Sequence, residues 1–182
     1  MKNKNNVPST IICNNDVELT KNEYYILYNF FVTHSLCNNQ SKRKRTLKEY
    51  GIKRITDIEK QLSKYIKIDK GTFDILETDS LHFEDLINYN LNDKNLFDLA
   101  EERGVFTKVQ ESNKYFQVFY YIRNSLAHGE YTLKKDANDE KYIIMQNSKK
   151  KSIRARMVVK VGTLINIIRI IDVNNIILGD NN

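Results

Sequence analysis

The chain has 182 residues, of which 41% are hydrophobic, so it is long enough for one domain with its own core. Its formal net charge of +6 favours an anionic partner such as RNA, because phosphate attracts a basic protein before any specific contact forms. Two cysteines do not suggest a disulfide framework, and no apolar run reaches the roughly 20 residues of a membrane helix.

The start of the chain predicts a short tail followed by a single domain. Residues 1–10 are polar and predict a disordered tail, while residues 11–182 form the domain. The tail leads into no signal-peptide core, so the cytoplasm is the expected compartment. Thr20 and Glu23 have the spacing of a capping box and open a helix that the apolar residues carry to about Leu36.

The middle of the chain predicts further helices. A basic run at residues 41–45 predicts a solvated loop, with RNA contact as the alternative. Apolar periodicity then predicts a helix over 46–68 and shorter helices over 81–89 and 94–103. Gly104 is expected to stop the last of these.

The final third of the sequence predicts two long helices separated by a hairpin. The first helix covers 113–128 and ends at Gly129, and the alternating segments 130–133 and 141–145 predict two short strands. Apolar residues over 152–171 recur at steps of three and four, which predicts a last helix that packs in a bundle. The expected fold is therefore mainly α, an up-and-down helical bundle with a small β-hairpin between the last two long helices.

Arg123 and His128 are the candidate catalytic residues. A histidine that titrates near neutral pH can transfer protons, and a permanently charged guanidinium can stabilise negative charge on phosphate oxygens. Asparagine follows the arginine directly and glycine follows the histidine. The other two histidines, His34 and His82, lack an arginine at this spacing and are interpreted as structural or surface residues.

This segment resembles a known family of nucleases. Its sequence is Arg123-Asn124-Ser125-Leu126-Ala127-His128-Gly129. It is similar to the motif of the HEPN superfamily (higher eukaryotes and prokaryotes nucleotide-binding), in which arginine, commonly followed by a polar residue, precedes histidine by five to seven positions. The resemblance extends over residues 112–170. It implies a HEPN-like helical bundle, a site at a homodimer interface, and a role as toxin or anti-phage effector with an antitoxin protein as a candidate partner.

Helix geometry independently favours a dimeric site. At about 100° per residue, Arg123 and His128 lie about 140° apart, too far for one regular helix to direct both side chains at one phosphate. The same geometry predicts one face that packs in the core and an opposite face that points outward. The core face is formed by Tyr115, Val118, Phe119, Ile122 and Leu126, and the outward face by Phe116, Gln117, Tyr120, Asn124 and Ala127. A two-fold axis beside helix 113–128 would bring two motifs together, with Phe116 and Tyr120 facing the partner. A distorted last turn before Gly129 is the alternative that would let one subunit suffice.

The predicted chemistry is RNA cleavage without metal or cofactor. The histidines are scattered and no Cys-x-x-Cys pattern occurs, so no metal site is expected. In RNA the 2′-hydroxyl can attack the adjacent phosphorus and leave a 2′,3′-cyclic phosphate and a 5′-hydroxyl. His128 would transfer the proton, Arg123 would stabilise the phosphorane, and Asn124 would orient a motif side chain or the ribose.

Three basic residues near the start of the predicted last helix are candidate RNA-binding residues. Arg154, Arg156 and Lys160 lie where the helix macrodipole disfavours cations, which favours contact with phosphate instead. Two other functions stay open. The first is a dimer that binds RNA or nucleotide without cleaving it, and the second is a structural helical protein whose basic residues serve solubility.

Overall fold

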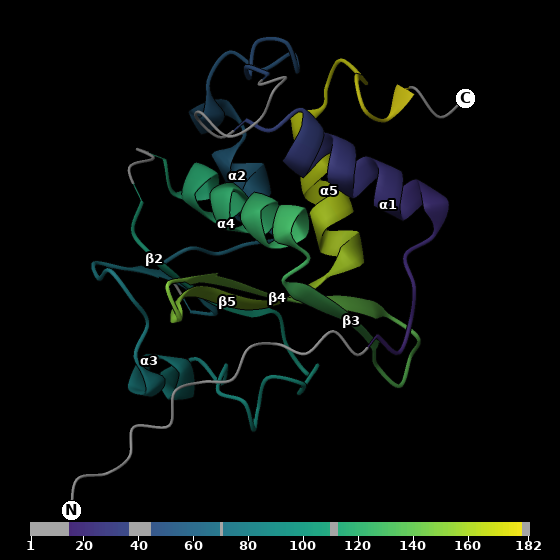
Figure 1. Ribbon diagram of the computed structural model, residues 1–182. Helices are drawn as coiled ribbons and strands as arrows, with labels where there is room; N and C mark the ends of the chain where they lie inside the picture. The colour runs from purple at the N-terminus through teal and green to yellow at the C-terminus, as the bar shows by residue number, and fades with distance from the viewer. Residues whose placement is uncertain (1–14, 37–44, 70, 110–112, 180–182) are drawn as a thin grey trace, which may run out of the picture.

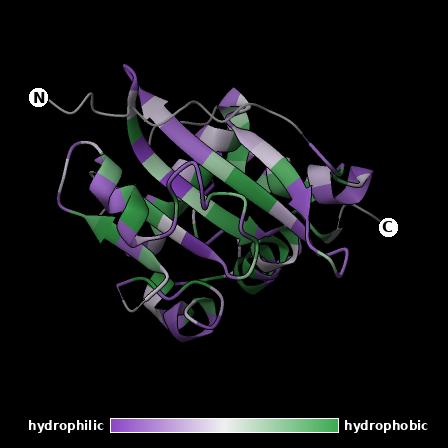
Figure 2. Cartoon of the chain, turned by 90° about the horizontal axis from the view of Figure 1, so that it is seen from below, coloured by the Kyte–Doolittle hydropathy of each residue, from purple (hydrophilic) through white to green (hydrophobic). Residues whose placement is uncertain are grey.

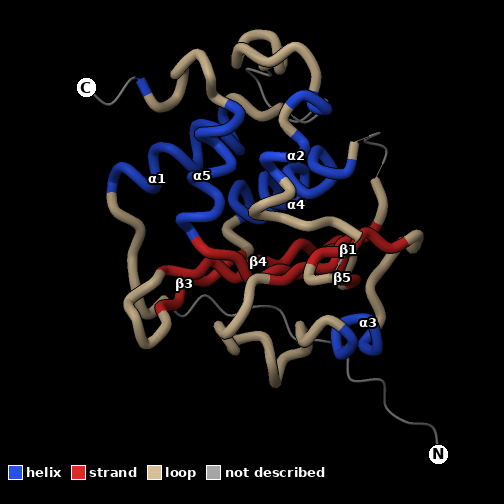
Figure 3. The backbone as a smooth tube through the Cα atoms, turned by 180° about the vertical axis from the view of Figure 1, so that it is seen from behind, coloured by secondary structure: helices blue, strands red, loops and turns tan. Residues whose placement is uncertain are grey.

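The computed structural model describes residues 15–36, 45–69, 71–109 and 113–179. Within these ranges the chain forms a five-stranded mixed sheet covered on both faces (Figure 1). Helices α1, α2, α4 and α5 lie on one face of the sheet, and α3 lies on the other, as the view from behind also shows (Figure 3). The predicted tail at 1–10 lies outside the described residues, as does the basic run except for Arg45.

The sheet has the order β1-β2-β5-β4-β3, which places the longest strands at its centre. The strands are β1 Phe73–Leu76, β2 Arg103–Thr107, β3 Tyr131–Lys135, β4 Lys141–Lys149 and β5 Ser152–Lys160. β1 and β2 run parallel, and the other neighbours are antiparallel.

The helices are short apart from α4 and α5. They are α1 Lys21–Tyr28, α2 Glu59–Leu62, α3 Phe83–Asn88, α4 Lys114–His128 and α5 Val161–Ile171. A π-helical turn, Asn29–Thr33, continues α1. The capping box at its start is confirmed: Thr20 N donates to Glu23 Oε2 at 2.7 Å, and Glu23 N donates to Thr20 Oγ1 at 3.2 Å.

The predicted up-and-down bundle is wrong, chiefly because residues 152–171 are not one helix. Their first half is β5, and only Val161–Ile171 is helical. Met157 and Val159 pack toward the helical layer, whereas Val158 packs on the α3 side. A central strand that is buried on both faces contains consecutive apolar residues, and a spacing of four fits a strand as well as a helix.

Two other predicted helices are also corrected. Residues 94–102 form turns and irregular structure that lead into β2, and Gly104 lies within this strand. A Cβ atom there would come within 2.9 Å of both the Phe106 and Phe73 rings, so the glycine permits close packing instead of stopping a helix. The predicted helix over 46–68 is interrupted at Gly51, whose φ is +90°, and only α2 and one 3₁₀ turn, Ile55–Asp57, remain.

The predicted hairpin is confirmed, although it is part of the larger sheet. β3 and β4 pair antiparallel from Tyr131 opposite Met145 to Lys135 opposite Lys141. β4 extends further than expected because its other edge pairs with β5 along eight residue pairs. The hairpin thus lies at one edge of the sheet, beside the C-terminal end of α4 (Figure 1).

The sheet separates two apolar cores. The larger core lies between the sheet and the helical layer, and the smaller one lies on the α3 side. The smaller core includes Leu86, Leu91, Val105, Ile144 and Val158. Seen from below, hydrophobic and hydrophilic residues are mixed along the strands (Figure 2).

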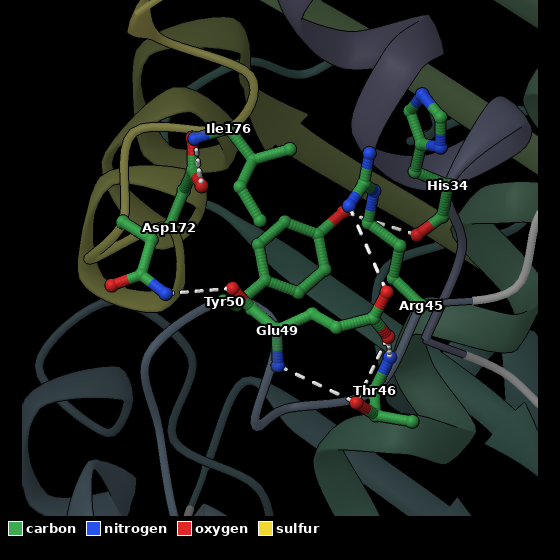
Figure 4. Close-up of polar contacts among 8 residues, drawn as sticks. His34, Arg45, Thr46, Glu49, Tyr50, Asp172 and Ile176 are labelled. Atoms are coloured by element: carbon green, nitrogen blue, oxygen red, sulfur yellow. Dashed lines mark hydrogen bonds and ion pairs between the residues drawn. The ribbon is translucent and has the colours of Figure 1, made fainter.

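A network of polar contacts joins the turn at 45–51 to the segment that follows α5 (Figure 4). Asn174 Nδ2 donates to the Glu49 carbonyl at 2.8 Å, and Asn174 N donates to the Tyr50 carbonyl at 3.2 Å. The Tyr50 hydroxyl donates to the His34 carbonyl at 3.0 Å. Most of these contacts use backbone atoms, so the network fixes the path of the chain around the helical layer.

Glu102 caps the N-terminus of α5 from the loop before β2. Its carboxylate accepts hydrogen bonds from Lys160 N at 2.7 Å and from Thr163 Oγ1 at 3.1 Å. Burial raises the pKa of Glu102, while these two hydrogen bonds and the nearby Lys160 charge lower it, and the net shift is upward from 4.5. The folded state therefore binds a proton at Glu102 more tightly than the unfolded chain does.

The contribution of Glu102 to stability should consequently depend on pH. The stabilisation that comes from tighter proton binding at Glu102 is fully present below 4.5, the ordinary pKa of a glutamate, and it is lost as the pH rises through the raised pKa of the folded state. Glu102→Gln mimics the neutral acid. The free energy of unfolding of this variant minus that of wild type should therefore increase as the pH is raised from acid to neutral. Urea unfolding at several pH values measures this difference, with Glu101→Gln as the control for loss of one negative charge. A difference that is constant or falls with pH contradicts the prediction.

Candidate functional site

Helix α4 carries the candidate catalytic residues, and both of its ends are capped, the C-terminal end at Gly129 as the sequence predicts. Asn113 Oδ1 accepts from Tyr115 N at 2.9 Å at the start. Gly129 adopts a left-handed conformation with φ of +68° at the end, where glycine is preferred. The residues predicted to form the core face are all buried: Tyr115, Val118, Phe119, Ile122 and Leu126.

The opposite face of α4 is more buried than predicted. Gln117 and Asn124, expected to face outward, are buried, because α4 lies between the sheet and the π-helical turn after α1. Ser125 Oγ donates to the Gln146 carbonyl of β4 at 2.9 Å, which fixes the helix to the sheet. Phe116 and Tyr120 are half-buried against the larger core, so only part of each ring is available to a partner.

Arg123 and Asn124 form a pair on this helix. Arg123 is half-buried, and its Nη1 donates to Asn124 Oδ1 at 2.8 Å. The Asn124 side chain is itself buried, so its amide oxygen has little freedom to move. The contact therefore restrains the guanidinium of Arg123 near the surface of the helical layer.

His128 is the last residue of α4, and its side chain is exposed. The helix closes immediately after it: Gly129 N donates to the Leu126 carbonyl at 3.3 Å, and Glu130 N donates to the Ser125 carbonyl at 2.9 Å. α4 is α-helical through His128, so the alternative of a distorted last turn is removed. Arg123 and His128 consequently stay about 140° apart around the axis within one chain.

Arg154 and Arg156 lie within β5, so the macrodipole argument is wrong for them, whereas Lys160 ends β5 and is the N-cap residue of α5. Arg154 is partly exposed, with Nη1 3.9 Å from Asp79 Oδ1. Lys160 Nζ lies 3.9 Å from Glu140 Oε2 and 5.6 Å from the centre of the Tyr142 ring. Neither residue contacts the Arg123–Asn124 pair through any hydrogen bond or ion pair found among the described side chains.

Arg156 is fully buried and has a structural position. Its Nε donates to Gln146 Oε1 at 2.8 Å, and its Nη1 donates to the Leu91 carbonyl at 2.9 Å and to Asp93 Oδ1 at 2.8 Å. Desolvation lowers the pKa of Arg156, while the contact with Asp93 raises it, and the net shift is downward. An arginine with these internal partners anchors the loop after α3 and is not presented to RNA.

Arg103 has a similar role that the sequence did not reveal, because it lay inside a predicted helix. Its guanidinium donates to four backbone carbonyls at 2.8 to 3.0 Å: Asn90, Asn95, Asp98 and Glu101. The one available signal was the run Arg103-Gly104-Val105-Phe106-Thr107, which can also be interpreted as a short buried strand. Arg103 and Arg156 together hold the 90–101 loop against the α3 side of the sheet.

Other kinds of site are not evident in the described part of the chain. Across residues 15–36, 45–69, 71–109 and 113–179, no group of three or more His, Cys, Asp or Glu side chains is arranged to hold a metal ion. None of the helices in these ranges is long and apolar enough to span a membrane. Comparison of the chain with protein-family models, with curated proteins and with solved structures gives no match in any of the three.

Proposed function

We propose that this chain is a metal-independent endoribonuclease. The observation that carries the proposal is the end of α4. There His128 is exposed, and Arg123, about one and a half turns earlier, is held by a hydrogen bond of 2.8 Å from its Nη1 to Asn124 Oδ1. The resemblance of residues 123–129 to the HEPN motif and the net charge of +6 support it further. The fold gives no support, because the HEPN-like bundle expected from the sequence is wrong.

The proposed reaction uses the ribose of the substrate as the nucleophile. The 2′-hydroxyl loses its proton and attacks the adjacent phosphorus, and the bond from phosphorus to the 5′-oxygen breaks. The 5′-oxygen takes up a proton, which leaves a 2′,3′-cyclic phosphate and a 5′-hydroxyl. His128 performs one proton transfer, and its counterpart in a second copy performs the other. Arg123 stabilises the charge on the phosphorane oxygens, and Asn124 positions Arg123. No cofactor takes part.

The site is formed by two copies of the chain. Regular helix geometry separates Arg123 and His128 by about 140°, so a second motif across a two-fold axis completes the site. The centre of α4 is largely buried, which restricts the homodimer contact over residues 115–128 to the exposed Ala127 and His128 and to the half-buried Phe116, Tyr120 and Arg123. The enzyme acts on RNA in the cytoplasm as a toxin or anti-phage effector, with an antitoxin protein as its partner.

Cleavage of RNA by the purified wild-type protein in the presence of EDTA tests the proposal. The expected products carry 2′,3′-cyclic phosphate and 5′-hydroxyl ends. DNA of the same sequence, and RNA with 2′-O-methyl riboses, should stay intact because neither has the nucleophile. Loss of cleavage with EDTA, or cleavage of DNA, contradicts the proposed mechanism. RNA binding without cleavage selects the non-catalytic binding protein instead, and absence of any RNA affinity selects the structural protein.

A further inference from the structure

Two tyrosines on α1 form an exposed aromatic stack. The ring centres of Tyr24 and Tyr28 are 4.1 Å apart, and the ring planes differ by 22°. Tyr28 is half-buried, whereas Tyr24 is 49% exposed. Such a stack presents a flat, firmly supported ring to solvent, which is the kind of surface on which an unpaired nucleobase stacks.

The stack lines a surface hollow with a suitable chemical character. The hollow measures about 600 Å³ and is bordered by Lys21 and Asn29 in addition to the two rings. This volume lies within the roughly 300–1,000 Å³ of sites for small ligands. Lys21 is the charged residue among the described lining side chains and can pair with a phosphate. Asn29 can donate to and accept from the polar edge of a base.

The stack is joined directly to the last turn of α4. The Tyr28 hydroxyl donates to the Leu126 carbonyl at 3.1 Å, the same carbonyl that Gly129 N contacts at 3.3 Å. Burial raises the pKa of Tyr28, so its hydroxyl stays protonated and remains a donor. α1 and the end of α4 lie on the same face of the sheet (Figure 1). The aromatic pair is therefore fixed relative to the turn that carries His128.

We infer that the Tyr24–Tyr28 face of α1 is a base-stacking subsite for single-stranded RNA whose cleaved phosphate lies at His128. The inference rests on the proposed ribonuclease function and adds to it the form of the substrate. Stacking on an aromatic ring accepts any base but requires one that is not paired, so a duplex cannot use this surface. The protein should accordingly bind and cut single strands in preference to duplexes.

The test is the affinity of Tyr24 variants for an uncleavable ligand, a fluorescein-labelled single-stranded RNA with 2′-O-methyl riboses. Tyr24→Leu should raise the Kd measured by fluorescence anisotropy about tenfold, because one stacked base is lost. Tyr24→Phe keeps the ring and should bind as wild type does. Phe97→Leu is the matched control, since Phe97 is also 49% exposed but lies in the loop after α3.

The outcomes separate this inference from the ribonuclease proposal. Cleavage by wild type together with unchanged binding and cleavage by Tyr24→Leu overturns the subsite alone. Weaker binding by Tyr24→Leu without cleavage by wild type supports the subsite and contradicts the ribonuclease. Preference of wild type for duplex RNA overturns the subsite. A change in the molecular mass of Tyr24→Leu, measured by light scattering, also overturns the subsite, because it would assign Tyr24 to a contact between protein copies.

Discussion

Replacement of His128 with alanine is expected to lower the rate of RNA cleavage about 10²-fold or more, because it removes the group proposed to transfer protons. Arg123→Ala should have an effect of about the same size, since the charge developing on the phosphorane then has no guanidinium beside it. Single-turnover cleavage of a labelled RNA measures both effects. His128 is exposed and caps no backbone group through its side chain in the described contacts, so its loss should leave thermal unfolding nearly unchanged.

Matched variants separate chemistry from structure in this experiment. His82→Ala removes the exposed histidine at the start of α3, on the other face of the sheet, and should cleave as wild type does. Arg123→Lys keeps the positive charge but not the planar guanidinium that Asn124 contacts, so it should restore only part of the rate. If His128→Ala cleaves RNA as fast as wild type after contaminating nucleases are removed, the enzymatic proposal is wrong.

Arg156→Met is expected to reduce the free energy of unfolding by about 3 kcal/mol, although methionine fills much of the same volume. The substitution leaves Gln146 Oε1 and the Leu91 carbonyl without their donor, and it leaves the Asp93 carboxylate without its cation. The cost lies near the low end of the roughly 3–5 kcal/mol for a broken buried ion pair, because the Asp93 side chain is 45% exposed and keeps contact with water. Urea unfolding at neutral pH gives the value.

Arg154→Met is the control for this second experiment. Arg154 lies two residues away on the same strand, but its ion pair with Asp79 spans 3.9 Å and Asp79 is fully exposed. The substitution should cost less than about 1 kcal/mol. Equal effects at the two positions, or unfolding of Arg156→Met at the same urea concentration as wild type, contradict the structural role of Arg156. If Arg156→Met binds RNA more weakly than wild type, the loss of binding should occur only under conditions in which the variant unfolds.

The features that sequence predicted correctly are those encoded by a few neighbouring residues. The capping box of Thr20 and Glu23, the cap of α4 at Gly129 and the hairpin after it each depend on contacts within a short stretch of chain. The core face of α4 was also correct, because a fifteen-residue helix gives a clear apolar period. The motif residues Arg123, Asn124 and His128 were also chosen from neighbouring positions, and their role stays a prediction.

The strands β2 and β5 depend on tertiary structure instead. Arg103 pairs with Val158, and Val105 pairs with Arg156, across more than fifty residues of chain. Apolar residues four apart fit a helix or a strand equally well, so only the partner strands determine which one forms. Arg103 and Arg156 also favoured the incorrect prediction of helices, because a charged residue suggests a solvated helix face unless its buried partners are known.

By itself, the sequence of this protein determined where α4 begins and ends and which residues form its motif, because helix caps and helix period act over a few residues. Only the tertiary structure decided how much of α4 is accessible. The sheet on one side and the turn after α1 on the other bury Asn124 and leave His128 exposed. It also decided that Arg156 is an internal anchor, since its acceptors lie at Leu91, Asp93 and Gln146, which come together only when the strands pair.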